Sequence, residues 1–215
     1  MDLAGFRKLP ILGILRGIRP EDVIPLVKTI EESGLSAMEI TMNTAGAAEL
    51  IKQAVKASGK KLAIGAGTVL GLKDLKAALG AGATFIVTPV LINEVMQYCR
   101  KRKIPVFAGA LTPSEIYQAW LAGAAMVKVF PAKFFGPEYF QEIKGPFNQI
   151  ELLACGGVTA QNMGEYFKNG ASAISFGASV FKKEWLAKKD YQSIGQGIRE
   201  YVQGYAGIKT PSCKG

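Results

Sequence analysis

A lysine in the middle of an apolar run is the residue whose type and setting point most directly to chemistry. Lys128 lies within Met126–Phe130, where every second side chain of an extended chain shares its face. Burial disfavours an ammonium ion, so we expect the pKa of Lys128 to be lowered and its amine to be neutral. Such an amine can attack a ketone to form an iminium ion. A structural ion pair, or an ammonium that reaches the pocket rim, is the alternative.

A glutamate within a second apolar run is the candidate proton carrier. Glu39 and Thr41 share one face of Ala37–Thr41. Alternation of side chains also allows Arg16 and Thr68, at the ends of two other apolar runs, to point to the same pocket as Glu39 and Lys128. Glu39 could move protons during a reaction or compensate the charge of Lys128 or Arg16, and both roles stay open.

Two glycine-containing loops indicate anion binding. CGGVT supplies Gly156 and Gly157, and FGASV supplies Gly177 and Ser179. Glycine lets backbone N–H groups approach an oxyanion, and we expect a helix to begin near Ser179 and add its positive end. The sequence therefore predicts a phosphate site, although a glycine after a strand also serves as an ordinary turn.

The absence of histidine excludes several kinds of catalytic site. Neither a Ser-His-Asp triad nor a histidine-rich zinc site can be built without imidazole. The cysteines, Cys99, Cys155 and Cys213, are widely spaced and contain no CxxC pair. GAGTV at 65–69 lacks the third glycine and the later acidic residue of a dinucleotide-binding fingerprint. We expect no metal and no cofactor, and we interpret Cys155 as a packing residue.

The elements that would position these residues alternate between short apolar runs and amphipathic segments. Eight runs about 23 residues apart favour a closed parallel barrel over an open sheet, so we expect one (β/α)8 TIM barrel over 1–215 with a flexible tail after about 203. The predicted strands are Ile11–Leu15, Ala37–Thr41, Leu62–Ala66, Thr84–Val87, Pro105–Ala108, Met126–Phe130, Glu151–Ala154 and Ala173–Phe176. The predicted helices are Glu21–Ser33, Ala47–Ser58, Leu72–Leu79, Ile92–Lys101, Pro113–Leu121 and Ala160–Asn169.

The amino-acid composition limits the kinds of partner that we expect the protein to bind. The 215 residues are 49% hydrophobic and 20% charged, with no apolar stretch long enough for a membrane span. The net charge of +9 comes from dispersed lysines without interleaved aromatic residues, so we expect a solvated basic surface that mildly favours an anionic small substrate, and no nucleic acid. The first residues lack a signal-peptide cleavage pattern, and a cytoplasmic protein is expected.

Seven motifs carry a family resemblance. EITMNT, GAGTVL, IVTPV, KVFPAKFFGP, GPF, GGVTAQN and FGASVF occur in this order between about Leu9 and Phe181. Together they resemble the 2-keto-3-deoxy-6-phosphogluconate / 4-hydroxy-2-oxoglutarate aldolase family. PILGILRGI and LTPSEIYQAWLAGA are similar to its 2-keto-3-deoxy-6-phosphogalactonate branch.

The resemblance implies a metal-independent class I aldolase, usually a homotrimer. It places the Schiff-base lysine at Lys128, the catalytic glutamate at Glu39, pyruvate contacts at Thr68 and Pro89, and phosphate loops at Gly156, Gly157, Gly177 and Ser179. Two positions depart from the phosphogluconate enzymes, which usually have arginine where this chain has Asn43 and often threonine where it has Cys155. Arg16 would then bind the substrate carboxylate.

The expected activity is cleavage of a 2-keto-3-deoxy-6-phospho sugar acid to pyruvate and glyceraldehyde 3-phosphate, with 4-hydroxy-2-oxoglutarate as a further substrate. Which epimer is preferred stays open. Two alternatives remain: a phosphosugar epimerase or isomerase that forms no covalent adduct, and a non-catalytic protein that binds a phosphorylated metabolite.

Overall fold

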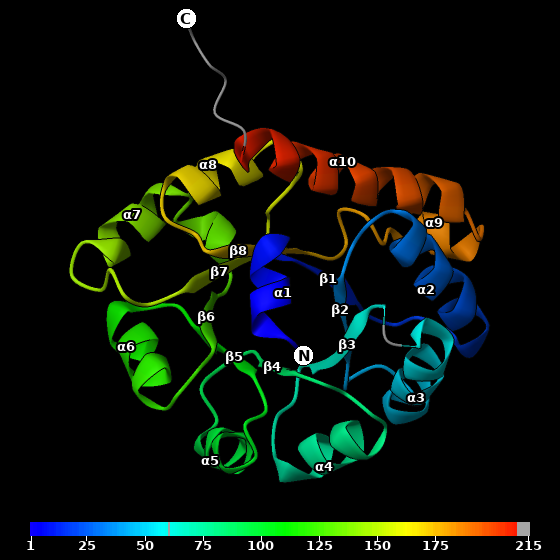
Figure 1. The fold of residues 1–215 in the computed structure, drawn as a ribbon, viewed down its shortest axis with the longest axis horizontal. Coiled ribbons are helices and arrows are strands. Elements are labelled where there is room, and N and C mark those ends of the chain that lie inside the picture. Colours follow the sequence, from blue (N-terminus) through cyan, green and yellow to red (C-terminus); the bar gives the residue numbers. More distant parts are fainter. Residues whose placement is uncertain (60, 210–215) are drawn as a thin grey trace, which may run out of the picture.

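Eight short parallel strands close into a barrel (Figure 1). The structure, a computed structural model, describes residues 1–59 and 61–209. Each strand pairs with the next along the chain, and β8 pairs with β1 to complete the circle. The strands are β1 Ile11–Leu15, β2 Ala37–Thr41, β3 Ala63–Gly67, β4 Ile86–Thr88, β5 Val106–Ala110, β6 Met126–Val129, β7 Leu152–Cys155 and β8 Ala173–Phe176. The predicted fold class is therefore confirmed.

Helices between the strands form a ring around the barrel (Figure 1). One of them, α6, begins at a capping box in which the Thr112 hydroxyl and the Glu115 carboxylate each bind the other residue's N–H, with Pro113 in the first turn. The α-helices are α1 Leu3–Lys8, α2 Val23–Glu32, α3 Ala47–Ser58, α4 Leu72–Gly80, α5 Asn93–Lys101, α6 Pro113–Leu121, α7 Glu138–Lys144, α8 Met163–Lys168, α9 Lys183–Ala187 and α10 Tyr191–Lys209, and the 3-10 turns are η1 Pro20–Asp22 and η2 Ala132–Phe134.

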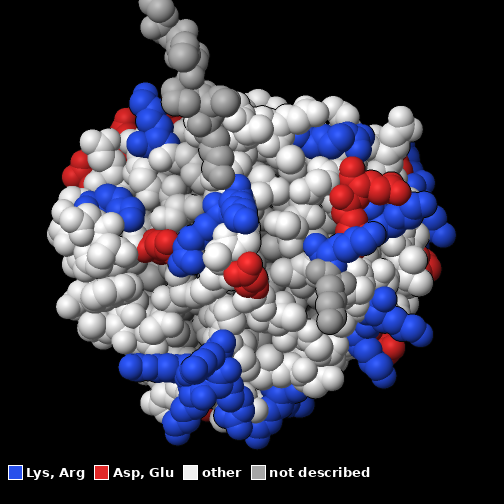
Figure 2. Space-filling view, in the orientation of Figure 1, with Lys and Arg blue, Asp and Glu red and all other residues white. Residues whose placement is uncertain are grey.

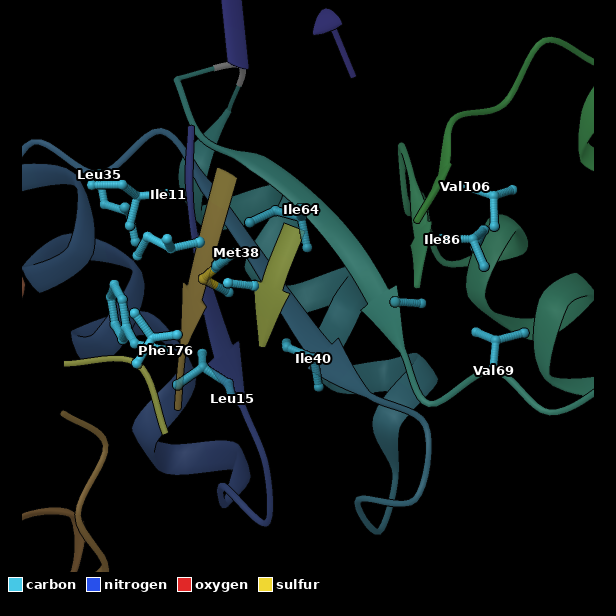
Figure 3. Packing of buried hydrophobic residues seen from close by; sticks show 14 of the residues in the cluster. Ile11, Leu15, Leu35, Met38, Ile40, Ile64, Val69, Ile86, Val106 and Phe176 are labelled. Atoms are coloured by element: carbon cyan, nitrogen blue, oxygen red, sulfur yellow. The ribbon is translucent and has the colours of Figure 1, made fainter. Parts of the chain in front are cut away.

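Side-chain alternation divides the core into two layers. Met38 and Ile40 point outward and pack under the helices (Figure 3), and Val127 belongs to the same cluster. Leu12 and Met126 point inward with other barrel residues, and Phe6 of α1 packs against them. The interior is therefore filled with side chains, and α1 adds an aromatic ring to it. This alternation puts Lys128 on the inward face, as predicted from the sequence.

Several element boundaries differ from the prediction. The segment expected as one helix over Glu21–Ser33 begins as η1, and α8 is shorter than the predicted Ala160–Asn169. Helices α1, α7, α9 and α10 were not predicted. A flexible tail was expected after about 203, and α10 continues through Lys209 in this part of the chain. The remainder of the tail, 210–215, lies outside the described residues.

Charged side chains on the face of Figure 2 carry both signs. Lys and Arg gather at the lower edge of this view, over α5, where Arg100 and Lys101 end the helix and Arg102 and Lys103 follow. Cations at a helix C-terminus complement its dipole, which gives this group a structural explanation. No helix in 1–59 or 61–209 is both long and apolar enough to cross a membrane.

Candidate active site

A cavity of about 940 Å³ opens among the loops that follow the strands. In a parallel barrel this end of the strands is where binding and catalytic side chains collect. Eight of the ten residues proposed from the sequence line the cavity: Arg16, Thr68, Pro89, Lys128, Gly156, Gly157, Gly177 and Ser179. Segments from six strand ends, far apart in sequence, thus meet at one site.

Lys128 supplies the only lysine amine that projects from a barrel strand into this cavity, within the described part of the chain. Its side chain is 8% exposed, and its Nζ lies 5.6 Å from the centre of the Phe130 ring. Burial by itself would lower the pKa of Lys128, but the opposing effects of Cys155 and Glu39 outweigh it and the pKa is raised. The expected lowered pKa of Lys128 is therefore wrong for the protein without substrate.

Glu39 is buried within the barrel below the cavity and is not part of its lining. Its Oε2 has no hydrogen-bond partner among the described residues, although the residue is only 1% exposed. Its Oε1 lies so close to Gly67 that a Cβ there would be 2.3 Å away, which explains the need for glycine in GAGTV. Burial raises the pKa of Glu39, and the charges of Lys128 and Arg16 only partly oppose this.

The two raised pKa values have a joint chemical meaning. The pKa of Lys128 is raised because the effects of Cys155 and Glu39 outweigh burial, and the pKa of Glu39 is raised by burial, so that Glu39 accepts a proton more readily than a carboxylate in water. Transfer of a proton from Lys128 to Glu39 would leave two neutral groups, the form that burial favours.

Arg16 and Thr68 line the cavity and contact each other. Nη2 of Arg16 donates to Oγ1 of Thr68 at 3.4 Å, and the backbone of Thr68 has a positive φ of 54°. The loop that carries Arg16 is fixed from below, because the N–H of Gly17 donates to Oγ1 of Thr44 at 3.0 Å. That hydroxyl also pairs with Oγ1 of the buried Thr41 at 3.1 Å. A guanidinium so placed is suited to bind a carboxylate.

The loops after β7 and β8 form another part of the lining. Gly156 and Gly157 have φ values of +90° and +87°, which favour glycine, and a Cβ on Gly157 would lie 2.4 Å from Cβ of Lys133. The expected helix near Ser179 is wrong: residues 178–180 form a turn in which the N–H of Val180 donates to the carbonyl of Gly177.

A hydroxyl bridge joins these two loops. Oγ of Ser179 pairs with the Tyr201 hydroxyl at 3.0 Å, and that hydroxyl donates to the carbonyl of Val158 at 3.0 Å. Within the described residues, the N–H groups of Ala178 and Ser179 donate no backbone hydrogen bond. Backbone N–H groups at glycine loops bind oxyanions without a helix N-terminus.

Two residues proposed from the sequence do not line the cavity: Glu39, which is buried in the barrel although it was expected to reach the pocket, and Asn43. Asn43 is exposed. Conversely, the structure adds Ser175 and Lys183 to the lining. Strand alternation with Ala173 could have identified Ser175, whereas Lys183 belongs to a lysine pair that we interpreted as part of a solvated surface. Cys155, interpreted as a packing residue, is 4% exposed and also lines the cavity.

Residues 1–59 and 61–209 contain no group of three or more His, Cys, Asp or Glu side chains arranged to hold a metal ion. The arrangement as described offers a buried amine, a buried carboxyl group and two sets of anion-binding groups. These are the parts needed to hold a keto acid and activate its carbonyl.

Comparisons with known proteins agree with this chemistry. A family model described as KDPG and KHG aldolase matches residues 4–197. A 2-dehydro-3-deoxy-6-phosphogalactonate aldolase of Escherichia coli (strain K12) is 32% identical over 195 residues, which are 90% of this chain and 95% of that protein. A 2-dehydro-3-deoxy-phosphogluconate aldolase of Pseudomonas aeruginosa is 30% identical over 93% of this chain and 91% of its own. A solved structure described as native KDPGal has a TM-score of 0.88 and 32% identity, covering 94% of this chain and 97% of its own.

Proposed function

Because the chain belongs to the KDPG and KHG aldolase family, whose members are lyases, we propose that it cleaves a phosphorylated 2-keto-3-deoxy sugar acid through a Schiff base on Lys128. The products are pyruvate and glyceraldehyde 3-phosphate. The observation that carries the proposal is the buried amine of Lys128 on the inward face of β6, within a cavity that has anion-binding groups.

The reaction begins when the Lys128 amine, after giving its proton to Glu39, attacks the C2 ketone. Loss of water, aided by Glu39, gives an iminium ion that withdraws electrons from the C3–C4 bond. The C4 hydroxyl passes its proton to Glu39, the bond breaks and the aldehyde leaves. The remaining enamine is protonated and hydrolysed to pyruvate, and Lys128 is regenerated.

Two parts of the cavity lining would hold the two ends of the substrate. Arg16 and Thr68 bind the carboxylate, while the loops containing Gly156, Gly157 and Gly177 bind the phosphate. Fixing both ends places C4 near the proton acceptor, an orientation effect of up to about 7–11 kcal/mol in favourable cases. The same carboxylate contacts would serve 4-hydroxy-2-oxoglutarate, which lacks the phosphate.

We infer a preference for the phosphogalactonate epimer. The relative in Escherichia coli that is 32% identical bears that name, and Asn43 lies outside the cavity. Cys155 lines the cavity beside Gly156, where its thiol is a weaker hydrogen-bonding partner than a hydroxyl. Recognition of a substrate hydroxyl at this position would therefore be weaker than with threonine.

We further propose a homotrimer that works in the cytoplasm. Four large apolar side chains in loops after β3, β4 and β6 support association: Leu70, Val90, Phe134 and Phe135 are between 56% and 71% exposed. Association between subunits would remove these side chains from water. The compartment is a prediction from the sequence.

The test is turnover of both phosphorylated epimers by the purified protein, followed through the release of pyruvate. We expect cleavage by the native chain and none by Lys128→Met. Interconversion of phosphosugars without pyruvate would favour an epimerase or isomerase, and thermal stabilisation by the sugar acid without any turnover would favour a binding protein. Either result would refute the proposal.

A further inference from the structure

The short helix α9 separates two cavities. Lys183, Leu186 and Ala187 lie at positions i, i+3 and i+4, on one face of the helix, and line the cavity of the active site. The preceding Lys182 and the intervening Trp185 line a second cavity of about 410 Å³ next to α10. Two consecutive lysines therefore belong to different sites.

The contacts of these lysines also differ. Nζ of Lys182 lies 4.1 Å from the centre of the Trp185 ring, which gives this cation a partner. Lys183 is exposed and forms no ion pair with any residue in 1–59 or 61–209. Its charge is thus available to a ligand in the larger cavity.

Other cations of this cavity are already engaged. Arg19 forms salt bridges to Asp22 at 3.0 Å and to Glu21 at 3.3 Å. Arg16 donates to Thr68. Lys128 has an electrostatic interaction with Glu39. Of the cationic side chains that line the described cavity, Lys183 is the one without an acidic partner or an assigned role.

The chain places Lys183 beside the loop after β8. The N–H groups of Val180 and Phe181 both donate to the carbonyl of Gly177, at 3.0 and 2.8 Å, which makes the turn compact. Phe181 is 6% exposed and anchors the start of α9. Lys183 therefore begins its helix directly after a turn whose Ala178 and Ser179 N–H groups make no backbone hydrogen bond.

We infer that Lys183 binds the phosphate group of the substrate from the α9 side and determines how strongly the enzyme prefers a phosphorylated aldehyde. The inference rests on the proposed function. The backbone N–H groups supply directional hydrogen bonds, and the flexible ammonium of Lys183 supplies a full positive charge that they lack.

The experiment compares two acceptor aldehydes that differ only in the phosphate. Condensation of pyruvate with glyceraldehyde 3-phosphate and with glyceraldehyde is measured for the native protein, Lys183→Met, Lys183→Arg and the matched control Lys182→Met. We expect Lys183→Met to lower kcat/KM for glyceraldehyde 3-phosphate about tenfold, as expected for loss of a charge-assisted contact, and to leave kcat/KM for glyceraldehyde unchanged. Lys183→Arg should retain most of the native kcat/KM for glyceraldehyde 3-phosphate, because it keeps the positive charge. Lys182→Met should behave like the native protein with both aldehydes.

The outcomes separate this inference from the proposed function. Equal effects of Lys183→Met on both aldehydes, no effect on either, or the same selective loss in Lys182→Met would overturn the role of Lys183 while condensation by the native protein upholds the aldolase. Failure of the native protein to condense pyruvate with either aldehyde would refute the proposed function and, with it, this inference.

Discussion

Lys128 and Glu39 act on each other's protonation within the barrel. Both have a raised pKa: that of Glu39 through burial, and that of Lys128 because Cys155 and Glu39 outweigh burial. Oε2 of Glu39 has no partner among the described residues. A buried carboxyl oxygen without a partner is costly, so a role in accepting protons explains its retention better than a structural role.

Glu39→Gln should lower kcat for cleavage by about 10²–10⁴-fold, because glutamine has nearly the same shape but cannot carry the proton. Steady-state kinetics would measure kcat for Glu39→Gln and for a control variant, and thermal unfolding would show that both are folded. Glu49→Gln, on the exposed side of α3, serves as the control and should keep native kcat. A folded Glu39→Gln protein with near-native kcat would assign Glu39 to charge compensation instead.

Cys155→Thr should shift preference toward the phosphogluconate epimer, because a hydroxyl in the cavity is a stronger hydrogen-bonding partner than a thiol. The two epimers differ at one carbon, so we expect a change in the ratio of kcat/KM values of about 10-fold, the effect of one buried hydrogen bond. The measurement is kcat/KM for both epimers before and after the substitution. A native preference for the gluconate epimer that does not change in Cys155→Thr would contradict the interpretation.

Residue-level prediction from the sequence succeeded where strand alternation alone decides. It placed Lys128 and Glu39 on the inward faces of β6 and β2, although Glu39 was expected to reach the pocket and is not part of its lining. It missed the direction of the Lys128 pKa shift, because that depends on Cys155, a residue of another strand. It also selected Asn43, because the family resemblance places an arginine of the phosphogluconate enzymes at this position, whereas the structure leaves Asn43 exposed outside the cavity.

At the scale of elements, the loops after β7 and β8 act as a unit. The hydroxyls of Ser179 and Tyr201 connect them through the carbonyl of Val158, so that α10 supports both loops from outside. A glycine directly follows both β7 and β8. A Cβ on Gly177 would meet Ile14 atoms only at ordinary contact distances of 3.4 Å or more. Gly177 can therefore be substituted without backbone strain.

Gly177→Asp should raise KM for the phosphorylated substrate by at least about tenfold, because a carboxylate beside the phosphate repels it. KM for 4-hydroxy-2-oxoglutarate should change little. Gly177→Asn, of equal size and no charge, is the matched control and should cause a smaller change. Equal increases in KM for both substrates with Gly177→Asp would argue against a phosphate site at this loop.

The strands were predictable as elements because each combines apolar residues with a nearby turn. β1, β2 and β8 have the predicted bounds, and the others differ by one or two residues at their ends. The short helices α1 and α9 were missed because segments of six and five residues are too short to show a clear helical periodicity. The helix predicted at Ser179 is a turn closed by two bonds to the carbonyl of Gly177, which no sequence pattern specified.

At the scale of the molecule, closure of the barrel brings together residues from six strand ends. Helix α1 lies across the centre of the ring in Figure 1, where Phe6 packs against inward side chains of the barrel. The inside of the barrel below the cavity is therefore filled. Access for a substrate is left to the loops that follow the strands, where the cavity lies.

The trimer proposed from the family resemblance would bury the exposed apolar side chains after β3, β4 and β6. Sedimentation velocity should give a mass close to three chains of 23.0 kDa. Val90→Lys should shift the protein toward smaller species, because it places a charge in the proposed interface. Ile24→Lys, at a similarly exposed position outside this group, should not. A monomer at every concentration would refute the trimer.

The central claim is the covalent intermediate on Lys128. Pyruvate and borohydride should add one reduced pyruvyl group per chain, and peptide mapping should place it on Lys128, the lysine that β6 projects into the cavity. Lys128→Met should remain unmodified. An adduct on Lys133 or Lys183 in the native protein, or no adduct at all in a preparation that releases pyruvate from the sugar acid, would contradict the mechanism.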